Sequence, residues 1–307
     1  MCEVATYQQV KKVDPTLTMR LRKAFFKDVN KRFAELALMV KRSVYNNDCF
    51  GLKDKVQANQ MQPLSEEELK YKNSSEKIAL FLLWLQTQVD NGILSTARFT
   101  DPWTDRYVYE AYKMGVVRAR QELIKAGYKI PTIEDMGGID VVLKNIYHVE
   151  KIGLLEGKVF TDLKGITDAM SSQISRILTE GFLNGETPAL IARKLVATIN
   201  GTGMGDLGIT DTLGRFIPAA RRALLLADTE ISRAFHRAVV QEYRNWGVLE
   251  ISVLAEWSTQ KDDKVCDKCA PMDGKVFTLD EIEPLIPFHP FCRCFILPHI
   301  EELQKYR

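Results

Sequence analysis

Four of the six cysteines and one of the four histidines lie in a single stretch near the end of the chain. They follow the pattern C-x2-C, then 19 residues, then H-x2-C-x-C, and they are Cys266, Cys269, His289, Cys292 and Cys294. A C-x2-C pair places two sulfurs on one tight turn, where both can bind an ion about 2.3 Å away. Tetrahedral zinc takes four ligands, so five candidates leave one spare. The spacing therefore predicts a zinc site.

Either Cys292 or Cys294 can be the fourth ligand. They are two residues apart, so in an extended segment they face the same side, and the sequence does not choose between them. A site with this many thiolate and imidazole donors is typically closed, which favours structural over catalytic zinc. Disulfides or metal-free thiols are the alternatives. Disulfides need an oxidising compartment, and the N-terminus M-C-E-V-A-T-Y lacks the apolar core of a signal peptide.

The same stretch carries a family resemblance. W-S-T-Q-K-D-D-K-V-C-D-K-C-A-P-M-D-G-K-V-F, followed by I-P-F-H-P-F-C-R-C-F-I-L-P, resembles the C-terminal signature of the bacteriophage Mu F-like head morphogenesis proteins, also called minor head or minor capsid proteins. A-D-T-E-I-S-R-A-F resembles their A-R-T-E segment, with Asp228 in the arginine position. The helical segment that begins at Trp103 is similar to the N-terminal half of the larger minor head proteins.

The resemblance implies a location and partners. It implies a few copies per particle at the portal vertex, inside the virion head, with assembly taking place in the host cytoplasm. The portal protein is the implied partner, together with scaffold or major capsid protein, and the implied roles are procapsid assembly and the organisation or ejection of DNA.

Length and composition agree with a globular protein of one large or two modest domains. The chain has 307 residues, of which 46% are hydrophobic and 27% charged, and its net charge of +2 gives no overall attraction to nucleic acid or membranes. The longest apolar run, Ile78 to Leu85, has eight residues, whereas a membrane-spanning helix needs about 20. We therefore expect no membrane contact.

A long basic helix is predicted near the N-terminus, beginning at Asp14-Pro15-Thr16. Its apolar positions recur every three or four residues and form one stripe: Leu17, Leu21, Phe25, Val29, Phe33, Leu36, Val40 and Val44. Between Lys11 and Arg42, ten basic residues stand against three acidic ones. The basic surface of this helix is either a solvated face or a contact for DNA or an acidic partner.

The predicted fold class is mainly α, with a helical N-terminal half and a C-terminal α+β module containing a small zinc-stapled sheet. We place a helical domain at 1–130, a linker or hinge at 131–157, and the Mu F-like domain at 158–307, with the zinc module at 251–298. The linker is assigned from its glycines, which are Gly137, Gly138, Gly153 and Gly157. Within the module we expect strands at Ile251–Trp257, Lys275–Leu279 and Cys294–Leu297.

A zinc-supported nuclease or effector enzyme, or a zinc-containing DNA-binding module, is the alternative function. No catalytic residue is predicted, because no acid, base and nucleophile form a matched set. Glu230 and His236 are six residues apart, about 240° around a helix, so they do not face each other. A G-x-G-x-x-G pattern at Gly203, Gly205 and Gly208 follows a helical segment instead of a strand, so it indicates a loop and no nucleotide cofactor.

Overall fold

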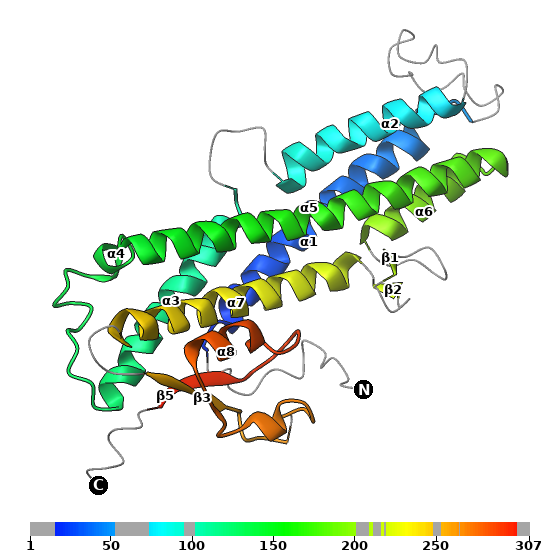
Figure 1. Cartoon of the computed structure of the whole chain (residues 1–307). Helices are drawn as coiled ribbons and strands as arrows, with labels where there is room; N and C mark the ends of the chain where they lie inside the picture. Colours follow the sequence, from blue (N-terminus) through cyan, green and yellow to red (C-terminus); the bar gives the residue numbers. More distant parts are fainter. Residues whose placement is uncertain are drawn as a thin grey trace. The chain divides into compact units, whose positions relative to one another are not determined.

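The computed structural model describes residues 16–52, 74–94, 102–200, 209–210, 216–217, 219–247, 253–263 and 265–299. Helices dominate this part of the chain, and a three-stranded antiparallel sheet lies near its C-terminal end (Figure 1). The predicted fold class is therefore confirmed. The pattern at Gly203, Gly205 and Gly208 lies outside the described residues, as do Lys11 and Lys12. None of the described helices is both long and apolar enough to span a membrane.

The chain forms two compact units, each assembled from separate segments. Unit 1 comprises Met1–Phe25, Trp103–Val159 and Leu225–Arg307, and unit 2 comprises Phe26–Pro102 and Phe160–Leu224. The division into 1–130, 131–157 and 158–307 stays a prediction. Within 131–157, the structure contains helix α4 (Ile139–Val142) and the beginning of α5 (Ile146–Leu183).

Helix α1 (Met19–Lys41) carries the predicted apolar stripe. Six stripe residues are buried, namely Phe25, Val29, Phe33, Leu36, Val40 and Val44, the last in a π-helical turn at Arg42–Asn46. The start of the helix was predicted too early. Leu17 precedes the helix with a φ of 57° and is 67% exposed, because the chain turns there before α1 begins.

The prediction for the basic surface of α1 was wrong at one residue. Arg22 was counted among the ten basic residues between Lys11 and Arg42, but it is 2% exposed and forms an ion pair with Asp228 at 2.7 Å, so it is not part of the basic surface. The remaining basic residues on the first turns are exposed, and they are Arg20, Lys23, Lys27 and Lys31. Because they recur every three or four residues, they form a row along one side of α1, which we call the basic row.

In unit 2, α2 (Ser74–Val89) buries one face only. Phe81, Leu85 and Val89 are buried, while Leu83 is 66% exposed. Phe50 joins this helix to α5: its ring lies 5.2 Å from the ring of Phe81 and 5.1 Å from that of Phe182. The unit also contains α6 (Pro188–Asn200) and a two-stranded sheet formed by β1 (Ile209–Thr210) and β2 (Phe216–Ile217).

Helix α5 is continuous over 38 residues. Gly153 and Gly157, which suggested a linker, lie inside it, and a Cβ atom at either glycine would have no neighbour within 4 Å. Glycine destabilises a helix by only about 1 kcal/mol relative to alanine, so neighbouring helix-forming residues can carry the helix through both positions.

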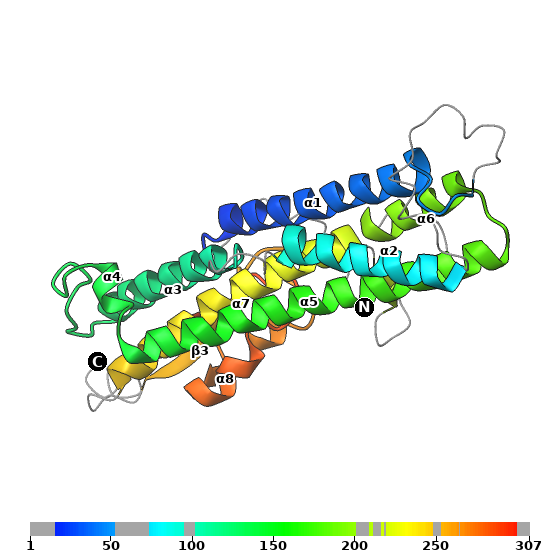
Figure 2. The same ribbon diagram turned by 90° about the horizontal axis from the view of Figure 1, so that it is seen from above.

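In unit 1, α3 (Asp105–Lys125) packs against α7 (Ala219–Gly247), and Figure 2 shows the two helices side by side. Gly115 lies at their closest approach. A Cβ atom added there would be 2.4 Å from the backbone oxygen of Phe235 and 2.6 Å from the Cβ of Ala238. The two backbones therefore touch without an intervening side chain.

We expect Gly115→Ala to destabilise unit 1 by about 3 kcal/mol, because the added methyl group pushes apart two backbones that cannot move independently. This cost outweighs the gain in helix propensity of roughly 1 kcal/mol. Chemical denaturation of the wild type and the Gly115→Ala variant measures this change in the free energy of unfolding. Gly153→Ala is the control, since its methyl group meets no neighbour. That variant should be slightly more stable than the wild type. Equal stability of the two variants would contradict the close contact.

The C-terminal sheet has the strand order β4-β3-β5. Its strands are β3 (Leu254–Ser258), β4 (Val276–Phe277) and β5 (Phe295–His299), and both pairings are antiparallel. The strand predicted to reach Leu279 ends at Phe277, because Thr278 and Glu281 form a capping box that starts α8 (Leu279–Leu285). Strand β5 continues past its predicted end through Pro298, which an edge strand tolerates.

Candidate metal centre

The first half of the cysteine cluster is a tight turn after β3. The backbone N–H groups of Cys269 and Ala270 both donate to the carbonyl oxygen of Cys266 at 2.9 Å, and a short 3-10 helix follows at Ala270–Met272. Cys269 is buried and Cys266 is half-buried. The turn therefore presents two sulfurs to one side, as the C-x2-C spacing predicts.

The second half is a turn that orients His289. The N–H of Cys292 donates to the carbonyl of His289 at 3.1 Å. The Nδ1 of His289 lies 2.7 Å from the carbonyl oxygen of Pro290, and this contact requires a proton on Nδ1. The lone pair is then on Nε2, which lies 3.2 Å from Cys266 Sγ and 3.1 Å from Cys269 Sγ. Fixing the far ring nitrogen in this way is characteristic of histidines that bind metals.

All five predicted residues meet in the structure. Their ligand atoms form two groups, Cys266 with Cys269 and His289, and Cys269 with Cys292 and Cys294, and within each group the atoms lie within 4.8 Å of one another. Tetrahedral zinc with Zn–S bonds of about 2.3 Å needs ligand separations of roughly 3.8 Å. Cysteines 49, 266, 269, 292 and 294 are free thiols. The cluster could therefore hold a metal ion, and its identity as zinc stays a prediction.

The electrostatics of the cluster favour the thiolate form at Cys292 and Cys266 and the thiol form at Cys269 and Cys294. Hydrogen bonds from Cys269 and Cys294 hold the pKa of Cys292 well below its ordinary value, and the same contact with Cys292 raises the pKa of Cys269. Burial raises the pKa of Cys266, but the N–H groups of Cys269 and Lys268 outweigh it and lower the pKa. The Cys269 hydrogen bond lowers the pKa of Cys294, yet Cys292 and burial raise it to about 12. A buried thiolate among thiols is the form that binds a metal ion.

Asp262 connects the two halves of the centre. Its carboxylate accepts two hydrogen bonds from Arg293, both at 2.7 Å, and Arg293 stands between the last two cysteines. A bidentate pair of this kind fixes both side chains. The centre rests on a buried core that includes Trp257, Phe295 and Ile282. Figure 1 shows the sheet and α8 on one side of α7.

The polar residues singled out on α7 do not form a catalytic set. Glu230 is buried and paired with Arg233 and Lys158. The ring nitrogens of His236 lie 2.7 Å from the carbonyl oxygen of Ser232 and 3.2 Å from that of Cys294, and burial lowers the pKa of His236 to about 4. Glu230 and His236 thus have separate partners, as their spacing predicts.

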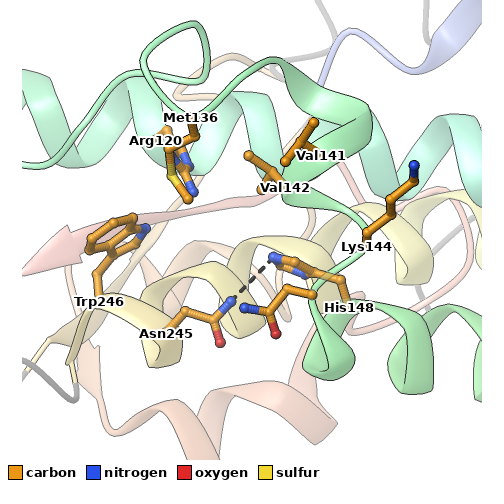
Figure 3. Close-up of a pocket in the computed structure, with 9 residues that line it drawn as sticks. Arg120, Met136, Val141, Val142, Lys144, His148, Asn245 and Trp246 are labelled. Atoms are coloured by element: carbon orange, nitrogen blue, oxygen red, sulfur yellow. Dashed lines mark hydrogen bonds between the residues drawn. The ribbon is translucent and has the colours of Figure 1, made fainter.

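A second polar site was not anticipated from the sequence. A cavity of about 400 Å³ is lined by Arg120, Met136, Lys144, His148, Asn245, Trp246 and neighbouring residues. Figure 3 shows how these side chains lie around it. Two of these lining residues contact the buried carboxylate of Glu242, which lies 2.6 Å from Arg120 Nε and 3.1 Å from His148 Nε2. Tyr112 Oη lies 3.0 Å from the other nitrogen of His148. Because Arg120 and Glu242 are 122 positions apart, no local pattern reveals the network.

Comparison with known proteins identifies one family. Residues 172–297 match the family model described as Phage Mu protein F like protein. The matched segment runs from within α5 to β5 and includes all five residues of the candidate metal centre. No curated protein and no solved structure matches the chain significantly. The family match confirms the resemblance within residues 172–297 and suggests a phage head morphogenesis protein with a virion location. The resemblance of the segment that begins at Trp103 lies outside the match and stays a prediction.

Proposed function

We propose that this chain, whose residues 172–297 belong to the phage Mu protein F like family, is a minor head protein that acts in procapsid assembly. The family match is the observation that carries the proposal. In the proposed arrangement a few copies bind the portal protein on the head interior, and scaffold or major capsid protein is a further partner. The proposed role is structural, in keeping with the family match.

The C-terminal module is proposed to be a unit stapled by one structural zinc ion. Three thiols and the imidazole of His289 would hold the ion, with the third thiol supplied by Cys292 or Cys294. When bound, zinc cross-links the turn at Cys266 and Cys269 to the segment before β5. The residues of this chain fix that geometry through the Asp262–Arg293 pair and the hydrogen bond from His289 to Pro290.

The basic row on α1 is the proposed contact surface. Lys23, Lys27 and Lys31 are exposed and spaced four residues apart, so their ammonium groups point to one side of the helix. An acidic surface of the portal protein or the phosphates of DNA would complement them. The two partners differ in their response to salt, since each phosphate contact lowers DNA affinity steeply as salt increases.

Co-purification with the portal ring encoded beside this protein tests the proposal. The two proteins are expressed together without other phage components and captured through a tag on the portal. We expect substoichiometric binding that survives moderate salt. If the folded protein fails to bind the portal alone and also fails in the presence of scaffold and DNA, the portal role is refuted.

A triple replacement of Lys23, Lys27 and Lys31 by alanine should weaken portal capture at least tenfold while leaving the thermal melting temperature unchanged, because the three side chains are solvent-exposed. Replacement of the exposed Lys129, Lys144 and Lys275 is the control, since it removes the same charge elsewhere. Equal capture of both variants would show that the basic row is not the contact. Loss of DNA binding without loss of portal capture would assign the row to DNA.

A further inference from the structure

The carboxylate of Asp228 on α7 is buried between two partners. It is 5% exposed. Its Oδ1 accepts a hydrogen bond from Arg22 Nη1 at 2.7 Å, and its Oδ2 accepts one from the backbone N–H of Phe291, also at 2.7 Å. One side chain thus joins the start of α1 to the turn between His289 and Cys292.

The turn at Phe291 needs such a partner. Phe291 has a φ of 61°, in the left-handed region that bulky side chains rarely adopt. A conformation of this kind persists only where surrounding contacts hold it. The hydrogen bond to a carboxylate is of the strong, charge-assisted type. It therefore fixes the N–H that stands between the two candidate ligands on either side, His289 and Cys292.

Arg22, the partner of Asp228 at the start of α1, is also held by several hydrogen bonds. The guanidinium of Arg22 donates to Thr18 Oγ1 at 2.8 Å and to Thr16 Oγ1 at 3.4 Å in addition to Asp228. Both threonines are buried. Because they precede α1 or begin its first turn, the orientation of Arg22 depends on how this segment is folded.

We propose that Asp228 is a positioning residue for the metal-binding turn, and that Arg22 couples the turn to the first turn of α1. The inference rests on the proposed zinc site. It means that metal binding favours the ordered start of α1, and by thermodynamic reciprocity the ordered start of α1 favours metal binding. A purely structural ion pair would stabilise the fold without affecting metal affinity.

Two double variants separate these roles. Both replace Arg22 by methionine, so neither leaves an unpaired buried guanidinium. One carries Asp228→Asn, which still offers an oxygen to the N–H of Phe291, and the other carries Asp228→Leu, which offers none. The zinc dissociation constant is measured by competition with a chromophoric chelator, and the absorption spectrum of the Co²⁺-loaded protein reports the geometry of the site.

We expect the Arg22→Met/Asp228→Leu protein to bind zinc tenfold to a hundredfold more weakly than the Arg22→Met/Asp228→Asn protein, with an altered Co²⁺ spectrum. Equal affinities and spectra in the two variants would overturn the positioning role while leaving the zinc site intact. A wild-type protein without stoichiometric metal would overturn both proposals, and this is read from metal analysis before any variant is compared.

Hydrogen exchange of the wild-type protein gives a test that needs no variant. Amide protection is measured with metal bound and after chelation. We expect the peptide that covers Thr18 to Phe25 to lose protection on chelation, together with the turn at Phe291. Unchanged exchange at the start of α1, with increased exchange at Phe291, would refute the coupling.

Discussion

Cys269→Ser is expected to abolish stoichiometric zinc binding and to unfold the C-terminal module. Cys269 is the residue common to both groups of candidate ligands, so its loss removes a ligand from each of them. Structural zinc contributes on the order of 10 kcal/mol of apparent folding free energy, more than most domains have in reserve. The metal content of the purified protein and the near-ultraviolet circular dichroism of Trp257 report the two effects.

Cys49→Ser is the matched control for this prediction. Cys49 is also a free thiol, and burial raises its pKa to about 11, but it lies in unit 2, outside the metal centre. Its replacement should leave the metal content at one ion per chain. The variants Cys292→Ser and Cys294→Ser then identify the fourth ligand, because one should lose the metal and the other should keep it. Full metal content in the Cys269→Ser protein would refute the site.

Arg120→Met should destabilise unit 1 by about 3 to 5 kcal/mol, because it leaves the carboxylate of Glu242 buried without its principal cation. Glu242 is fully buried, and its Oε1 accepts hydrogen bonds from Arg120 Nε at 2.6 Å and Trp246 Nε1 at 2.7 Å. Urea denaturation measures the change. Arg120→Met/Glu242→Leu should recover part of the loss, since it removes both charges together.

The pH dependence of the free energy of unfolding is a second test of the network around Glu242. Burial raises the pKa of Glu242, but the hydrogen bond from His148 and the charge of Arg120 outweigh it and hold the pKa below its ordinary value. A carboxyl group whose pKa is depressed by folding stabilises the protein above the pKa of the unfolded state. That contribution is lost as the pH falls through the folded pKa. Glu242→Gln should therefore flatten the acid limb of the stability curve.

Arg176→Met is the control for both measurements. Arg176 and Glu180 form an ion pair at 3.8 Å on the surface of α5, with both side chains about half exposed. Such pairs contribute roughly 0 to 1 kcal/mol, so the variant should unfold nearly as the wild type does. If Arg120→Met were as mild as this control, the buried network would not be a stabilising element.

The parts of the structure that the sequence predicted depend on short-range patterns. The spacing of Cys266 and Cys269 is sufficient to indicate one half of the cluster, because a single turn brings both sulfurs to one side. The stripe from Phe25 to Val44 likewise follows from helical periodicity. Helix α8 was missed although its signal was present, since Thr278 and Glu281 have the spacing of a capping box.

The wrong predictions concern residues whose burial depends on partners that are distant in the sequence. Arg22 has the same local sequence context as the exposed lysines of α1, and its burial depends on Asp228, which is 206 residues away. The network around Glu242 was not predicted for the same reason, because His148 and Glu242 meet only when α5 packs against α7. The continuity of α5 was missed for a different reason: glycine indicates a break on average, but Gly153 and Gly157 stand in a segment with enough helix-forming residues to continue.

The contact between α3 and α7 also determines when unit 1 can fold while the chain is being synthesised. Arg120 and Glu242 are separated by 122 residues, so the partner of α3 leaves the ribosome long after α3 itself. At 5 to 20 residues per second the delay is roughly 6 to 25 seconds. During that interval Arg120 and the core residues Ala119 and Leu123 of α3 have no α7 to pack against. The nascent chain therefore presents a transient surface for chaperones, and unit 1 closes only after α7 has emerged.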